Sequence, residues 1–409
     1  MSALLLMSEA GNATRFKFNS PMTALPGILS AFTYTRSSNK TVLQNGRLVT
    51  LSANQFGTSY DPVTGLYGYL PETAATNLLL YSNDFSNVAW GKNNSTITPN
   101  STTSPDGSNN ASLLTCSANN GYVTQGFTSS AAIYTHAVYV KKGNTRYCQI
   151  SIYDGVSTHT YIFDFDNNCA LTGTLASPEG YLAENIGNGW FRISIRKTLT
   201  AGAGRYATIW PSTSPTSSVQ SNGDTLYIYG AQLETGSYAS TYIPTTSATA
   251  TRAADVLTVP LANIAGFVQS EYTLFADCRS PYVGGGSVAQ VAMAVRDATS
   301  TNTAYIYMLD DVGQPVGLVR SGGVNQSIQV GSISGVSRYK HALSVISNSS
   351  KYSKNGTASA EDTTVTMPIS PTTLSIGVEV SSGHFNGYIY SSALYTRALS
   401  QAQINGLTS

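Results

Sequence analysis

The sequence predicts an all-β protein of two tandem β-sandwich or jelly-roll domains that follow an irregular N-terminal arm. Only 11% of the 409 residues are charged, while glycine and tyrosine are abundant, a composition that favours strands and turns over long helices. Short segments alternate apolar and polar side chains, and turn residues separate them. A stretch rich in threonine, serine and alanine at 245–251 divides these segments into two groups.

The first 75 residues show weak periodicity. Phe16–Phe18 and Arg47–Leu51 have the composition of short strands. Between Asp61 and Gly65 the chain has turn chemistry, because proline presets φ and glycine accepts the open position. We therefore expect residues 1–75 to form an irregular arm or attachment segment that depends on its neighbours for order.

Residues 76–256 are predicted to form the first β domain. The segment Tyr147–Tyr153 alternates cleanly, and Asp154-Gly155 after it is a hairpin signal. Tyr161–Asp166 continues the pattern, with Tyr161, Phe163 and Phe165 expected on one side. Repeated strands of period two with polar turns indicate a sandwich or jelly roll.

Residues 257–409 are predicted to form the second β domain. Its clearest hairpin is Asn355-Gly356. One short helix is expected at the end of the chain, because Ser400 and Gln403 have the spacing of a capping box.

Charge and hydropathy exclude several classes of function. The formal net charge is +1, and no cluster of lysine and arginine suits a nucleic-acid backbone, so no nucleic-acid partner is expected. The apolar run Ala3–Met7 is too short to span a membrane and lacks a basic leader and a cleavage site, so we expect neither membrane insertion nor an export signal.

No sequence pattern indicates a catalytic centre. The four histidines and four cysteines lack metal-ligand spacing, and phosphate-binding loops and nucleophile elbows are absent from the sequence. A glycosidase needs two carboxyl groups, one of which stays protonated. The candidate pairs are Asp164 with Asp166, Asp310 with Asp311, and Glu361 with Asp362. Such pairs are common by chance, and we expect no enzyme and no cofactor.

Aromatic side chains are the candidates for recognition. Tyrosine and tryptophan present large, rigid surfaces that stack on the apolar face of a sugar. The candidate platforms are Tyr153, Tyr206 and Trp210 in the first domain and Tyr282, Tyr305 and Tyr307 in the second. The alternative for each is that it fills a sandwich edge or a subunit interface.

The C-terminal part resembles the closing half of a concanavalin-A-like (laminin-G-like) β-sandwich. The motifs that carry the resemblance are Lys351–Thr357, Leu374–Gly377, Phe385–Ile389 and Tyr395–Ser400. The resemblance implies recognition of sugars or other surfaces. Such sandwiches sometimes bind Ca²⁺, for which Asp297, Asp310 and Asp311 are weak candidate ligands.

Residues 72–255 resemble a module of tailed-bacteriophage virion proteins, especially tail fibres and related appendages, with the architecture of carbohydrate-binding jelly rolls. The motifs appear in order: Thr76–Leu79, Ser82–Phe85, Pro105–Gly107, Tyr139–Gly143, Gly187–Arg192, Gly230–Glu234, Tyr242–Thr245 and Arg252–Asp255. The resemblance implies a receptor-binding virion protein, made in the bacterial cytoplasm, that adheres to a host cell-surface glycan. Its partners would be other virion proteins and copies of itself, most plausibly as a homotrimer.

Two alternatives stay open. One is a purely architectural protein, such as a capsid decoration or a tail-assembly protein, that binds only other virion proteins. The other is a tail enzyme that degrades surface polysaccharide.

Overall fold

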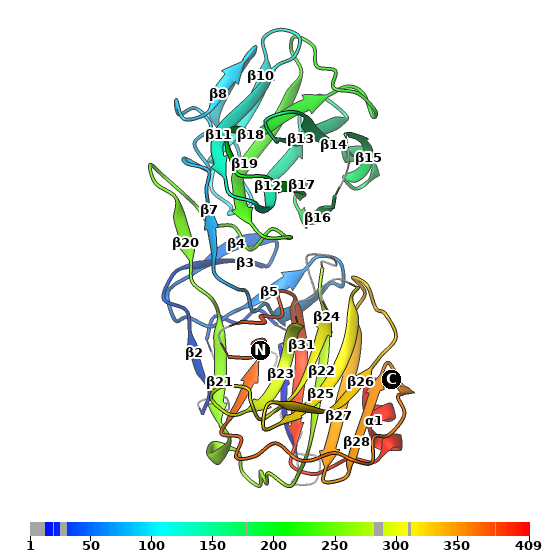
Figure 1. The fold of residues 1–409 in the computed structure, drawn as a ribbon. Coiled ribbons are helices and arrows are strands. Elements are labelled where there is room, and N and C mark those ends of the chain that lie inside the picture. The colour runs from blue at the N-terminus through cyan, green and yellow to red at the C-terminus, as the bar shows by residue number, and fades with distance from the viewer. Residues whose placement is uncertain are drawn as a thin grey trace. The chain divides into compact units, whose positions relative to one another are not determined.

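The computed structural model describes residues 13–18, 20–24, 31–176, 179–281, 289–309, 312–380 and 382–409. Within these ranges the chain forms antiparallel β-sandwiches, which confirms the predicted fold class (Figure 1). Two compact units are present. We call residues 40–50 with 75–252 the central sandwich, and residues 1–39, 51–74 and 253–409 the C-terminal sandwich.

The central sandwich consists of two six-stranded sheets, in the orders β16-β17-β12-β19-β10-β9 and β15-β14-β13-β18-β11-β8. Two small ladders, β3–β4 and β7–β20, belong to the same unit. The elements are β3 (Lys40–Gln44), β4 (Arg47–Leu51), β7 (Ala75–Asn77), β8 (Gly91–Asn93), β9 (Ser95–Thr102), β10 (Ala111–Cys116), β11 (Tyr122–Ser129), β12 (Ala132–Lys142), β13 (Tyr147–Tyr153), β14 (Thr158–Asp164), η2 (Phe165–Asn167), β15 (Ala170–Leu175), β16 (Tyr181–Gly187), β17 (Trp190–Leu199), β18 (Gly202–Ser212), β19 (Thr225–Thr235) and β20 (Ala250–Arg252).

The alternation read from the sequence sets the core of the central sandwich. In β13, Cys148, Ile150 and Ile152 are fully buried between the sheets, as the period-two pattern predicts. The next strand ends earlier than expected. Phe165 already belongs to the 3-10 turn η2, because the Asp164 side chain accepts a hydrogen bond from the Asp166 amide and caps that turn.

The C-terminal sandwich consists of an eight-stranded sheet, ordered β29-β28-β27-β22-β31-β6-β5 with β1 also on β31, and a seven-stranded sheet, ordered β2-β21-β30-β23-β24-β25-β26. One apolar cluster draws residues from both sheets. The elements are β1 (Ala13–Lys17), β2 (Thr33–Thr35), β5 (Thr58–Asp61), β6 (Leu66–Tyr69), β21 (Val256–Pro260), η3 (Leu261–Asn263), β22 (Glu271–Arg279), β23 (Ala289–Arg296), β24 (Thr303–Leu309), β25 (Gln314–Ser321), β26 (Val324–Val330), β27 (Tyr339–Ile346), β28 (Ser349–Lys354), β29 (Thr357–Ala358), β30 (Thr373–Ile376), β31 (Tyr388–Tyr395) and α1 (Gln401–Thr408).

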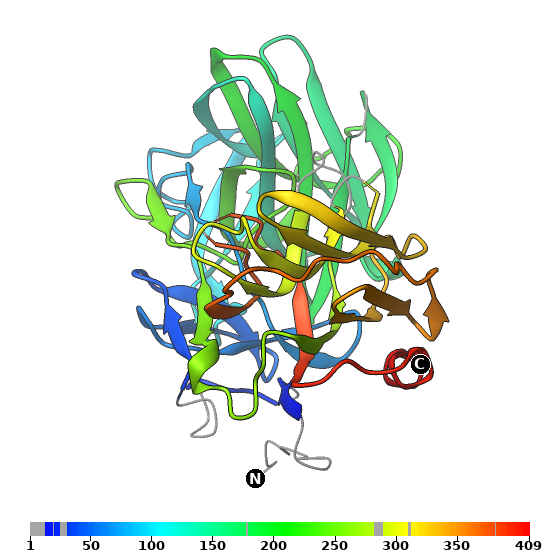
Figure 2. The same cartoon turned by 60° about the horizontal axis from the view of Figure 1, so that its bottom comes forward.

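The N-terminal segment is not the irregular arm that we expected from residues 1–75. β1 and β6 both pair with β31, and β5 pairs with β6. Figure 1 shows β2 beside β21, with which it pairs, and in Figure 2 the dark blue β1 lies beside the orange-red β31. The β3–β4 hairpin belongs instead to the central sandwich. These strands have three to five residues each, which is too short for period-two alternation to be visible in the sequence.

The local signals at the C-terminal end of the chain are confirmed. Asn355 and Gly356 both have positive φ, at 48° and 79°, in the turn between β28 and β29. Ser400 and Gln403 form the capping box at the start of α1. Among the described residues, no helix has the length and apolar character needed to cross a membrane.

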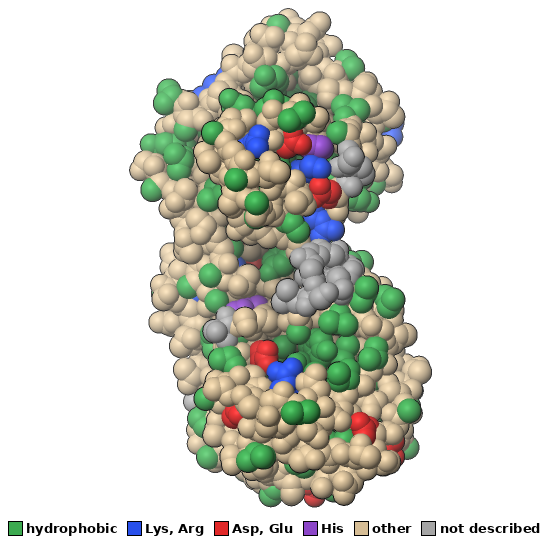
Figure 3. Space-filling model, viewed as in Figure 1, with side chains coloured by type: hydrophobic (Ala, Val, Ile, Leu, Met, Phe, Trp, Pro, Cys, Tyr) green, Lys and Arg blue, Asp and Glu red, His purple; other side chains and the backbone are tan. Residues whose placement is uncertain are grey.

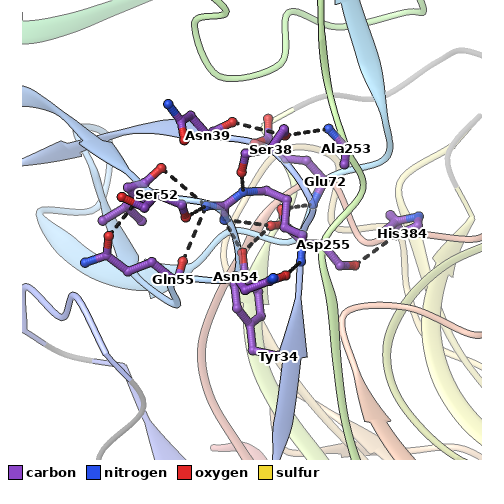
Figure 4. A network of polar contacts seen from close by, with 12 residues as sticks. Tyr34, Ser38, Asn39, Ser52, Asn54, Gln55, Glu72, Ala253, Asp255 and His384 are labelled. Carbon is purple, nitrogen blue, oxygen red and sulfur yellow. Dashed lines mark hydrogen bonds and ion pairs between the residues drawn. The ribbon is translucent and has the colours of Figure 1, made fainter.

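A buried polar network ties together separate segments of the C-terminal sandwich (Figure 4). The Asp255 carboxylate lies 3.3 Å from the Arg36 guanidinium and accepts hydrogen bonds from the Tyr34 hydroxyl and the Glu72 amide. Both ion-pair side chains are fully buried. The network therefore joins β2, the chain after β6 and the start of the third segment of this sandwich.

Candidate binding site

A hollow of about 430 Å³ lies on the outer face of the sheet that contains β13, β18 and β11. Its lining is formed by Tyr122, Thr124, Tyr153, Thr158, Tyr206, Thr208 and Trp210. The volume is in the range of small-molecule binding sites. The hollow therefore brings together the three aromatic candidates that the sequence placed in the first domain.

Strand pairing explains why these residues converge. Residues next to the buried positions of β13 point away from the core. Tyr153 lies opposite Tyr206 on β18, and Thr124 of β11 lies opposite Thr208. One row across the sheet therefore places two tyrosines side by side, and another places two threonine hydroxyl groups side by side.

Two aromatic pairs flank the hollow. The ring centroids of Tyr153 and Tyr206 are 6.1 Å apart, and those of Tyr122 and Trp210 are 5.8 Å apart. Tyr206 is 42% exposed, whereas Trp210 is only 7% exposed. Tyr206 is therefore the side chain with most ring surface to offer a ligand, and Trp210 acts more as a wall.

Polar contacts fix the tryptophan. The Trp210 indole N–H donates to the Gln149 side-chain oxygen, which also accepts from the Ser218 hydroxyl at 2.8 Å. The Gln149 amide in turn donates to the Ser212 hydroxyl at 2.6 Å. Because these side chains hold one another, the wall is organised before any ligand arrives, which lowers the entropy lost on binding.

The floor of the hollow is polar and carries no formal charge. The hydroxyl oxygens of Thr124 and Thr208 are 2.9 Å apart. None of the seven lining side chains is acidic or basic. Aromatic faces with hydroxyl donors and acceptors between them can bind a ligand that has both apolar faces and hydroxyl groups.

A carboxylate lies at the turn next to Tyr153. The His159 ring nitrogen Nε2 is 2.7 Å from the Asp154 carboxylate. Burial alone would raise the pKa of Asp154, but hydrogen bonds from the Ser157 amide and from His159 lower it to about 2. Asp154 is therefore ionised over the physiological range and stabilises the turn rather than transferring protons.

The second-domain candidates do not form a matching site. Tyr305 and Tyr307 are 4% and 7% exposed, so they are not the exposed platforms that we expected. They pack on the face of β24 opposite the main core, in a cluster with Val291, Val316 and Leu318. The third candidate, Tyr282, lies outside the described residues.

The candidate acid pairs lack the properties of a glycosidase pair where the structure describes them. Arg146 makes two hydrogen bonds to the Asp164 carboxylate and holds its pKa below the ordinary value, and Lys142 pairs with Asp166. Glu361 and Asp362 likewise have lowered pKa values, Glu361 through Lys351 and Asp362 through the Thr364 amide. The pair Asp310 and Asp311 lies outside the described residues.

Of the three weak calcium candidates, the structure describes only Asp297. The Asp297 carboxylate accepts hydrogen bonds from Thr299 and Asn302 within its own turn. Asp310 and Asp311 lie outside the described residues. Among the described ranges, no three acidic, histidine or cysteine side chains form a group suited to a metal ion.

Sequence reasoning missed Tyr122 and the three threonines of the hollow. Tyr122-Val123-Thr124 alternates around a buried valine, so the pattern was present. What the sequence did not reveal was that β11 pairs with β18, which places these residues beside Thr208 and Trp210.

Comparison with known proteins gives only distant likenesses. No protein-family model and no curated protein matches the chain. The CBM40 of the Ruminococcus gnavus IT-sialidase, solved with alpha2,3 sialyllactose, is 14% identical over 35% of this chain and 84% of its own, with a TM-score of 0.30. The NanB sialidase of Streptococcus pneumoniae is 16% identical over 36% of this chain and 26% of its own, also at 0.30.

A third structure is similar to the same degree. Domain 4 of AbnA, an extracellular arabinanase of Geobacillus stearothermophilus solved with arabinotriose, is 16% identical over 42% of this chain and 82% of its own, at a TM-score of 0.30. At these identities and TM-scores, none of the three assigns a family or a ligand to this chain. The lining and geometry of the hollow are therefore the basis for a functional assignment.

Proposed function

We propose that this protein is a non-enzymatic glycan-binding protein whose central sandwich holds the sugar. The observation that carries the proposal is the hollow in which Tyr206 and Tyr153 flank a floor of threonine hydroxyls. A pyranose ring has apolar C–H faces and an equatorial rim of hydroxyls. Aromatic rings stack on the C–H faces, and hydroxyl side chains form hydrogen bonds with the rim of hydroxyls.

The open form of the hollow suits a chain of sugars more than one enclosed molecule. Tyr206 is exposed on the surface of the sheet, and the lining carries no charge. A shallow, neutral site of this kind gives weak binding, and several copies on one particle raise the avidity by about 10²–10⁴. We therefore propose that the protein works as a homo-oligomer, specifically a homotrimer.

The setting that we propose is a bacteriophage virion, where the protein is a tail fibre or appendage that binds a host surface glycan. The ordered motifs between Glu72 and Asp255 that resemble a tailed-phage virion module support this setting. The low charge of the chain also suits extensive contacts between subunits.

The test is a glycan array with the full chain, followed by titration of the best neutral oligosaccharide against Tyr206→Ala. We expect the variant to weaken binding by about 1–2 kcal/mol, roughly 5- to 30-fold in Kd, because the exposed ring is lost. Tyr181→Ala is the matched control, since Tyr181 is 53% exposed on the edge strand β16 of the same sandwich but lies outside the hollow.

Equal affinity of Tyr206→Ala and the unmodified chain would overturn the site. If no glycan bound and particles without the protein's central sandwich adsorbed normally, the architectural role would replace adhesion. Release of fragments from purified polysaccharide would show an enzyme.

A further inference from the structure

A second pocket of the central sandwich has the opposite electrostatic character. It has a volume of about 290 Å³ and is lined by Arg47, Thr103, Ser104, Pro105, Gly107, Lys141, Asn188 and Trp190. Two of these side chains are cationic and none is acidic. Lysine and arginine side chains are sparse on the face shown in Figure 3, and the chain has only 22 of them among 409 residues. Two cations at one pocket are therefore a local concentration of positive charge.

The β3–β4 hairpin brings Arg47 to this pocket. The Leu48 amide donates to the Pro105 carbonyl at 2.9 Å, which anchors the hairpin on the loop between β9 and β10. Gly107, at φ +88°, lies under the arginine: a Cβ there would lie 3.1–3.2 Å from the guanidinium and its stem. The absence of a side chain at Gly107 therefore makes room for Arg47 to lie flat along the pocket.

Lys141 enters from β12, at the other side. It lies opposite Trp190 in the β12–β17 ladder, and its stem runs along Gly189, where a Cβ would be 3.6 Å from Lys141 Cε. Asn188, in the same turn as Gly189, donates to the Gly46 carbonyl at 3.4 Å. The same turn thus shapes the lysine side of the pocket and contacts the hairpin that carries the arginine.

No ion pair between described residues neutralises Arg47 or Lys141. Within the part of the chain that the structure describes, neither Arg47 nor Lys141 makes an ion pair or a side-chain hydrogen bond. The acidic residue of the adjacent loop is Asp106, and its carboxylate accepts from the Ser104 hydroxyl, the Ser108 amide and the Tyr229 hydroxyl. These hydrogen bonds occupy both oxygens of the Asp106 carboxylate.

We propose that this pocket binds the carboxylate of an acidic sugar, with Arg47 as the principal ligand and Lys141 as the second charge. The planar guanidinium fork matches the two oxygens of a carboxylate, and lysine adds an undirected positive charge. Ser104, Thr103 and Asn188 supply neutral polar groups for the neighbouring hydroxyls. The pocket is separate from the tyrosine hollow, whose lining shares none of its residues.

The probe is glucuronate, with glucose as its neutral counterpart, titrated into the full chain at low ionic strength. We expect glucuronate to bind, glucose to bind at least roughly tenfold more weakly, and added salt to weaken glucuronate binding. Arg47→Gln should reduce the glucuronate affinity roughly tenfold or more, because a charge-assisted hydrogen-bond pair is lost.

Lys142→Gln is the matched control. It removes the same charge one residue away from Lys141, where Lys142 is instead paired with Asp166, and it should leave glucuronate binding unchanged. Tyr206→Ala should leave it unchanged as well, which separates this pocket from the hollow. Thermal melting of each variant checks whether the fold is kept.

Equal glucuronate affinity in Arg47→Gln and the unmodified chain would overturn the proposal, as would equal binding of glucose and glucuronate. Titration with inorganic phosphate distinguishes a general anion site. If phosphate bound and glucuronate did not, the acidic-sugar assignment would be wrong.

Discussion

Each sandwich carries a pair of tyrosines on the outer face of a sheet, and the two pairs differ in their exposure to solvent. Tyr153 and Tyr206 of the central sandwich flank an open hollow. Tyr305 and Tyr307 of the C-terminal sandwich, with ring centroids 5.0 Å apart, are buried. All four obey the same alternation along their strands.

The difference lies in the residues across the strands. Around Tyr305 and Tyr307 the neighbours in register are Ala294, Val291, Leu318 and Val316, which complete an apolar cluster. Around Tyr206 and Tyr153 they are Gly126 and Thr158, which leave the rings uncovered. Whether a tyrosine on the outer face is exposed or buried therefore depends on the side chains beside it on the neighbouring strands. Strand pairing determines which side chains these are.

The largest test of this contrast is Tyr307→Ala. Truncation of a buried aromatic leaves a cavity, and we expect the C-terminal sandwich to lose about 3–5 kcal/mol of unfolding free energy. Tyr206→Ala should cost the central sandwich less, about 1 kcal/mol, because 42% of the side chain is already exposed and its removal leaves no enclosed cavity. Denaturant unfolding of both variants measures the difference, and equal losses would remove the distinction between the two pairs.

The second test uses pH, because each sandwich also buries a neutral histidine. Burial lowers the pKa of His136 in the central sandwich to about 4. Burial, with a smaller effect of Lys354, lowers the pKa of His341 in the C-terminal sandwich to about 3. The unfolded chain protonates histidine near pH 6.5, so stability is complete above that pH and falls as the pH is lowered.

For His136 the loss should reach about 3 kcal/mol by pH 4 and then level off, whereas for His341 it should continue to about pH 3. Urea unfolding between pH 7 and pH 3 measures the slopes. His136→Gln should flatten the slope of the central sandwich alone, and an unchanged slope would assign the acid sensitivity to other groups.

The smallest effect is expected for Thr208→Val, which makes the floor of the hollow more apolar, as the surroundings of Tyr305 and Tyr307 are. The change is nearly isosteric, so the fold should lose little stability. Oligosaccharide affinity should fall by about 1 kcal/mol, roughly fivefold, because one hydroxyl partner is removed. Calorimetric titration beside Tyr206→Ala ranks the two contributions, and a gain in affinity would mean that the floor does not contact the sugar's hydroxyls.

The sequence predicted those features that are encoded within about ten consecutive residues. β13 spans Tyr147–Tyr153 as expected, because its alternation and the following turn agree. The capping box at Ser400 and the turn at Asn355 likewise depend on neighbours only. Tyr153, Tyr206 and Trp210 were named from the sequence as candidate platforms of the first domain, and the structure brings all three into the lining of one hollow.

Features that depend on distant pairing were not predictable. Phe16–Phe18 had the composition of a short strand and overlaps β1, but its pairing could not be recognised, because its partner β31 lies more than 370 residues further along the chain. The burial of Tyr305 depends on Leu318 and Ala294 from two other strands. The contribution of Arg47 to a pocket beside Lys141 and Asn188 depends on the docking of a hairpin that the sequence had placed in an arm.

The pairing of β1 with β31 also constrains the order in which the two sandwiches can fold during synthesis. A ribosome adds about 5–20 residues per second, so the first strand waits roughly 20 seconds or more before its partner has been translated. The central sandwich, whose residues 75–252 emerge meanwhile, can complete most of its sheets in that interval. A chain interrupted before Tyr388 would therefore contain a folded central sandwich but lack β31, and the strands that pair with β31 would expose unpaired backbone groups that favour aggregation.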